Sequence, residues 1–127
     1  IRDSCKAEIE NNLNGPAAAL PYLNQIRARA GAPEYGKHNR FPAPSTKEAM
    51  NDAILKERGY ELVFEFQRRA DLIRFGKYEE VVNAHLKKLG IAQPTNVTSS
   101  LRYFPYPLND AQLNPNLAAE NPSRLPK

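Results

Sequence analysis

Tryptophan is absent from these 127 residues, and the sequence contains only one cysteine and two histidines. A single cysteine excludes a disulfide bond within the chain and any cysteine-rich metal site. Three polar residues come directly before Cys5, where a lipid-modified cysteine would need an apolar run, so we expect a half-buried thiol on a helix. His38 and His85 do not stand at metal-ligand spacing from each other or from Cys5, and we therefore expect no metal site.

Long apolar runs and long basic blocks are missing as well. No stretch approaches the roughly 20 apolar residues that a membrane-spanning helix needs. The formal net charge is +4, but acidic and basic residues alternate almost throughout, which predicts no nucleic-acid partner. The sequence has no phosphate-binding glycine loop and no nucleophile elbow, and we expect no cofactor. It starts without a methionine or a signal peptide, so we expect a piece of a longer protein.

Helical periodicity runs through most of the chain and predicts an all-α fold. In residues 1–31, a weak helical pattern and a turn cluster lead to Pro16, which suits the first position of a helix. That second helix is expected to end at Gly31. The resulting hairpin is the unit of tetratricopeptide-type arrays, although no second copy is visible in the sequence.

Residues 46–76, which lie within the longest stretch without proline, predict one long central helix. Leu55, Leu62 and Phe66 belong to an apolar stripe that should face the core. Gly59 lies in the same stripe and costs about 1 kcal/mol relative to alanine in a helix. We therefore expect a neighbour that packs closely against its backbone.

A second stripe on this predicted helix is charged in its middle. Acids and arginines three and four residues apart can pair within the helix or reach backbone groups of a packed neighbour. We predict a structural ion-pair network made of Arg58, Glu61, Glu65, Arg68, Asp71 and Arg74. The alternative is a pair of catalytic carboxylates chosen from Glu57, Glu61, Glu65 and Asp71, as in glycoside hydrolases. A nearby guanidinium favours the charged carboxylate, whereas a general acid needs a raised pKa, so we expect no enzyme and no catalytic residues.

The loop at residues 32–45 contains three prolines and is long enough to suggest a function. Sugar sites combine an aromatic platform with amide and charged donors, because the pyranose face is apolar and its rim is polar. The candidate ligand-binding residues are therefore Tyr35, His38, Asn39, Arg40 and Phe41. The alternative is that Tyr35 and Phe41 simply pin the loop to the body of the protein.

We expect a single module over residues 1–127. Its parts are a helical hairpin at 1–31, a loop at 32–45, a long helix plus a following helix at 46–90, and a proline-rich extended tail at 91–127. In the tail, Tyr103, Phe104 and Tyr106 are expected to pack on the helices rather than to bind a ligand.

Three segments in this order resemble a known family. They are YLNQIRARAG at 22–31, ILKERGYELVFE at 54–65 with the DLIR that follows, and YFPYP at 103–107 with the LNPNL that follows. The chain is similar to the C-terminal part of SusD/RagB-family proteins. The resemblance implies a surface lipoprotein of the outer membrane of Bacteroidetes-type bacteria. Such a protein captures a glycan or another nutrient for a SusC-like TonB-dependent transporter and touches the membrane only through an N-terminal lipid anchor outside this chain.

The resemblance has local departures. The family often has arginine at the position of Gly59, glycine at Phe66 and a Trp-Phe pair at 69–70. The alternative reading is a free-standing helical adaptor that binds a protein partner in the groove of its hairpin. A SusD-like piece should expose an apolar face where the rest of its protein docks, whereas an adaptor should present a defined peptide groove.

Overall fold

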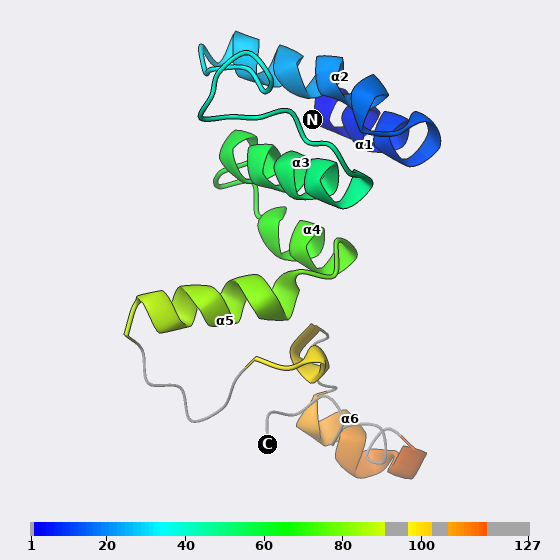
Figure 1. The fold of residues 1–127 in the computed structure, drawn as a ribbon. Coiled ribbons are helices and arrows are strands. Elements are labelled where there is room, and N and C mark those ends of the chain that lie inside the picture. Colours follow the sequence, from blue (N-terminus) through cyan, green and yellow to red (C-terminus); the bar gives the residue numbers. More distant parts are fainter. Residues whose placement is uncertain (1, 91–96, 103–106, 117–127) are drawn as a thin grey trace. The chain divides into compact units, whose positions relative to one another are not determined.

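The computed structural model describes residues 2–90, 97–102 and 107–116 (Figure 1). The described part contains no strand beyond an isolated bridge between His38 and Phe41, which confirms the all-α prediction. The predicted packing of Tyr103, Phe104 and Tyr106 lies outside the described residues, as does much of the tail. The helices are α1 (Arg2–Asn14), α2 (Pro16–Arg29), α3 (Lys47–Glu61), α4 (Arg68–Arg74), α5 (Tyr78–Lys88), a 3-10 turn η1 (Ser99–Arg102) and α6 (Leu108–Leu113).

The chain forms two compact units, residues 1–71 and residues 72–127. Within the first unit, α1, α2 and α3 pack against one another. The side chains at the centre recur at helical spacing, and Leu23, Met50 and Ile54 are fully buried. The predicted single module stays a prediction.

The hairpin forms as its turn residues dictate. Gly15 has a φ of 90° before Pro16, which occupies the first turn of α2. At the other end of α2, Gly31 takes a φ of 66°, and the N–H of Ala32 donates to the carbonyl of Arg27 at 2.8 Å. This is a Schellman ending, in which a glycine is favoured because it has no Cβ to clash. Helices α1 and α2 pack against each other. The likeness of this pair to a tetratricopeptide unit stays a prediction.

The predicted single helix over 46–76 is wrong. Thr46 caps α3, with its Oγ1 accepting from the N–H of Ala49 at 3.1 Å. Helix α3 ends at Glu61, however, and α4 begins only at Arg68. Between them, Phe64 and Phe66 have φ values of 68° and 58°. Residues with left-handed backbone angles cannot continue the hydrogen-bond pattern of an α-helix, so the chain turns here. Phe66 is 95% exposed and does not belong to the core stripe.

The glycine in the apolar stripe has the close neighbour that we expected. A Cβ added to Gly59 would lie 2.9 Å from Nη1 and 3.1 Å from Cζ of Arg68. The guanidinium of Arg68 therefore covers the backbone of α3 at the point where α4 returns toward it. Both residues belong to the first unit.

The second unit contains α5 and the segment at 97–102. The side-chain amide of Asn83 donates to the carbonyl of Val97 at 3.0 Å and accepts from its N–H at 2.8 Å. Arg102 makes two hydrogen bonds to Glu79, at 2.6 and 3.0 Å, and these bonds lower the pKa of Glu79. Such contacts tie the segment to α5. Helix α6, in the region predicted as an extended tail, is a short helix that ends at Leu113, before Pro115.

Candidate ligand-binding loop and ion-pair network

The loop after α2 is fastened to that helix by an amide pair. Asn24 on α2 donates from Nδ2 to the carbonyl of Tyr35 at 3.0 Å, and its Oδ1 accepts from the N–H of Tyr35 at 2.9 Å. Tyr35 is buried, and its hydroxyl donates to Oε1 of Glu57 on α3 at 3.2 Å. One residue of the loop thus bonds to both α2 and α3.

Arg27 completes this attachment from inside the first unit. Its guanidinium donates to Glu57 and to the carbonyl of Pro33. The guanidinium carbon lies 4.7 Å from the ring centroid of Tyr35 and 4.3 Å from that of Phe41, within the range of cation–π attraction. The two rings meet edge to face at 5.9 Å. We call the set Asn24, Arg27, Tyr35, Phe41 and Glu57 the loop clamp.

The loop clamp changes the acidity of its tyrosine. Burial, and then the carboxylate of Glu57, raise the pKa of Tyr35 to about 12. Both causes act against the phenolate, because it is poorly solvated and lies beside a negative charge. Tyr35 therefore remains a neutral hydrogen-bond donor at physiological pH.

The tip of the loop is a tight turn. The N–H of Phe41 donates to the carbonyl of His38 at 2.9 Å, and the N–H of Arg40 donates to Nδ1 of His38 at 3.2 Å. His38, Asn39 and Arg40 are exposed. Of the five predicted ligand residues, these three share the exposed tip, whereas Tyr35 and Phe41 lie in the loop clamp. Ligand binding by any of them stays a prediction.

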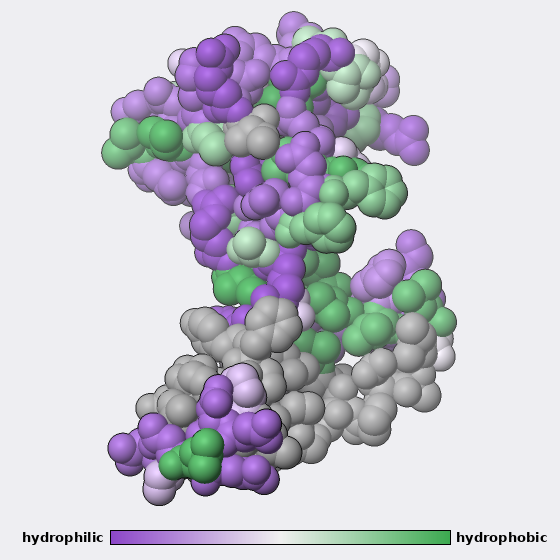
Figure 2. All heavy atoms as spheres, turned by 180° about the vertical axis from the view of Figure 1, so that it is seen from behind, coloured by the Kyte–Doolittle hydropathy of each residue, from purple (hydrophilic) through white to green (hydrophobic). Residues whose placement is uncertain are grey.

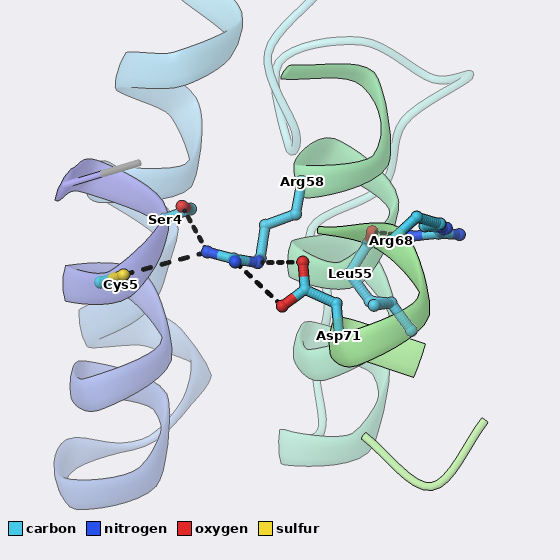
Figure 3. A network of polar contacts seen from close by, with 6 residues as sticks. All are labelled: Ser4, Cys5, Leu55, Arg58, Arg68 and Asp71. Atoms are coloured by element: carbon cyan, nitrogen blue, oxygen red, sulfur yellow. Dashed lines mark hydrogen bonds and ion pairs between the residues drawn. The ribbon is translucent and has the colours of Figure 1, made fainter. Parts of the chain in front are cut away.

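A second polar network lies where α1, α3 and α4 meet (Figure 3). Arg58 forms two hydrogen bonds to Asp71, from Nε at 2.8 Å and from Nη2 at 2.9 Å, and both side chains are buried. Its Nη1 donates to Oγ of Ser4 at 3.1 Å and points toward Sγ of Cys5 at 3.9 Å. This arginine therefore connects three helices.

The other predicted members of the network lie in different settings. Arg68 donates from Nη1 to the carbonyl of Leu55 at 2.6 Å. This is a bond to a backbone group, one of the two kinds of contact that the sequence pattern allowed. Glu61 pairs with Arg29 of α2. The guanidinium of Arg74 lies 4.6 Å from the ring centroid of Phe75. Glu65 lies in the turn between α3 and α4 and is exposed.

Sequence reasoning missed the pair of Arg27 and Glu57. The two residues are 30 positions apart, and spacing along one helix shows only neighbours three or four residues away. A signal was nevertheless present. Arg27 follows buried Leu23 by four residues, and Glu57 follows buried Ile54 by three, so both charges stand at core positions of their helices. Charges at core positions predict a partner across the interface.

Two of the four candidate catalytic carboxylates each form an ion pair with a different arginine. Glu57 pairs with Arg27, and Asp71 pairs with Arg58, in each case with both side chains less than a tenth exposed. Within the described ranges, no three histidine, cysteine or acidic side chains come close enough to share a metal ion. No helix in the same ranges has the length and apolar character to cross a membrane.

A shallow open groove of about 390 Å³ runs beside α2. Leu20, Pro21 and Ala28 form its apolar part, and the exposed ion pair of Glu34 and Lys37, with 2.8 Å between Oε2 and Nζ, stands at its border. The lining of this groove comes from α2 and the loop that follows it.

The fold and the clamped loop define an all-α protein whose polar clusters hold helices together and present a loop. The chain belongs to the SusD family, whose model matches residues 5–123. It is 38% identical over 109 residues to the SusD-like protein P25 of Formosa agariphila. The match covers 86% of this chain but only 20% of that relative, so the chain spans about a fifth of the relative's length. No solved structure matches the chain.

Proposed function

We propose that this chain is part of a surface lipoprotein that captures a glycan or another nutrient and delivers it to a SusC-like TonB-dependent transporter. Capture is non-covalent and needs no cofactor. The observation that carries the proposal is the SusD-family match over nearly the whole chain. Family membership favours this reading over a free-standing helical adaptor.

The role that we propose for these residues is to support and present a binding loop. Arg27, Tyr35 and Glu57 of the loop clamp are buried, and Tyr35 bonds to both α2 and α3, so the tip is held in one conformation before a ligand arrives. A preordered loop loses less conformational entropy on binding than a mobile loop. His38, Asn39 and Arg40 supply imidazole, amide and guanidinium groups, which suit the hydroxyl rim of a sugar.

Affinity electrophoresis of the full-length protein through gels that contain different soluble polysaccharides tests capture. We expect at least one polysaccharide to retard the protein. The double variant Asn39→Ala, Arg40→Ala should be retarded less, while Lys56→Ala, an exposed change on α3, should behave as the parent. Absence of retardation by every polysaccharide would argue against glycan capture. Equal retardation of the parent and the loop variant would show that the loop tip does not bind the polysaccharide.

Delivery has a separate test. The affinity-tagged full-length protein, extracted from cells in a mild detergent, should copurify with a TonB-dependent transporter. Recovery of the protein without any transporter would contradict the delivery step. It would not bear on glycan capture, which the electrophoresis tests separately.

A further inference from the structure

The turn between α3 and α4 carries the most exposed apolar side chains of the first unit. Phe64 is 91% exposed and Phe66 is 95% exposed, and Tyr60 and Val63 beside them are more than half exposed. Figure 2 shows apolar surface over this connection. We call these four residues the apolar corner. Folded proteins rarely expose adjoining large apolar side chains unless another surface covers them.

The apolar corner is held in place by its surroundings. Leu62, inside the turn, is buried, and its N–H donates to the carbonyl of Arg58 at 3.0 Å. The N–H of Glu65 donates to the carbonyl of Leu62 at 3.1 Å. Beyond the turn, Arg68 bonds back to Leu55. These contacts hold two phenylalanines with positive φ, a backbone conformation that bulky residues rarely adopt.

The acid between the two phenylalanines, Glu65, is exposed. In the part of the chain that the structure describes, Glu65 has no ion pair, although Arg58 and Glu61 on the adjoining helix have partners. An exposed carboxylate flanked by aromatic side chains fits a surface that offers an apolar pocket and a basic residue together.

We infer that the apolar corner docks on another part of the same polypeptide, outside these 127 residues, into an apolar pocket with a lysine or arginine facing Glu65. The matched relative is about five times as long as the segment that aligns with it, so a larger body of the same protein is the expected occupant. The inference rests on the exposed apolar corner and on family membership, and it does not require glycan capture.

Photo-crosslinking in the full-length protein tests this docking. Benzoylphenylalanine is placed at Phe66 in one variant and at Phe64 in a second, and the crosslinked peptides are identified by mass spectrometry. We expect both probes to crosslink to a peptide outside residues 1–127, at a yield that does not change over a hundredfold dilution. Crosslinks to residues 72–127, crosslinks to a second copy that vanish on dilution, or no crosslink from either position would each overturn the inference.

A stability comparison provides an independent measurement on the same protein. Phe66→Ala should lower the unfolding midpoint of the full-length protein by several degrees, because a docked aromatic ring would lose its pocket. The exposed Gln67, in the same turn, offers a matched control, and Gln67→Ala should leave the midpoint unchanged. Glu65→Gln should lower the midpoint at low salt more than at high salt. Midpoints for Phe66→Ala and Gln67→Ala that agree with the parent would contradict docking.

Discussion

At the scale of single residues, buried arginines organise the first unit. Arg27 and Arg58 each pair with a buried carboxylate and also reach a group on a further segment, the carbonyl of Pro33 in one case and the hydroxyl of Ser4 in the other. A buried guanidinium needs such partners because its desolvation is unfavourable. These contacts fix how the helices and the loop meet.

Arg58→Ala should destabilise the protein by about 3–5 kcal/mol, because it leaves the buried carboxylate of Asp71 without its partner. Arg29→Ala is the matched control, since Arg29 pairs with Glu61 but its side chain is 61% exposed. Exposed pairs contribute about 0–1 kcal/mol. Urea unfolding of both variants measures the difference. Equal, small losses would show that the Arg58 pair is not buried in solution.

The raised pKa of Tyr35 predicts that the protein loses stability at alkaline pH. Its folded pKa of about 12 lies above the ordinary value of 10.0, so its contribution to stability is complete below pH 10 and is lost as the pH rises toward 12. Tyr35→Phe should remove this part of the alkaline loss, whereas Tyr60→Phe, at an exposed position, should retain it. Thermal unfolding at pH 8, 10, 11 and 12 provides the measurement. Parallel profiles for the parent and Tyr35→Phe would refute the burial of the phenol.

At the scale of elements, the sequence could predict the helices whose ends carry local signals. Pro16, Gly31 and Thr46 mark ends or starts because each has a backbone or capping preference that acts within a few residues. The break between α3 and α4 carries no such signal. Phe64 and Phe66 adopt positive φ against their own preference, so longer-range contacts decide this turn. Arg68 and Glu61 also bond to residues far away along the chain, Leu55 and Arg29. Spacing within one predicted helix could not reveal these partners.

The contact between α3 and α4 predicts an energetic coupling between Gly59 and Arg68. Alanine at position 59 should gain up to about 1 kcal/mol of helix propensity, but its Cβ would displace Arg68 from the carbonyl of Leu55. Gly59→Ala should therefore stabilise the Arg68→Ala variant more than the parent, by about 1 kcal/mol. A double-mutant cycle measured by urea unfolding gives this coupling. Additive effects would mean that the two residues do not touch.

At the scale of the whole molecule, the candidate site was only partly predictable. The loop at 32–45 could be selected from its prolines and aromatic residues, but the sequence alone could not separate Tyr35 and Phe41 in the loop clamp from the three residues at the tip. That division depends on Arg27 and Glu57, which reach the loop from two helices. The chain spans about a fifth of the length of its relative.

We propose that the full-length protein holds a glycan without altering it. The most direct measurement incubates the protein with a polysaccharide that retards it, recovers the bound and free glycan, and compares chain length and reducing ends with the starting material. We expect the glycan to be retained and recovered unchanged at every time point. Shorter chains or new reducing ends that accumulate in proportion to protein and time would contradict it.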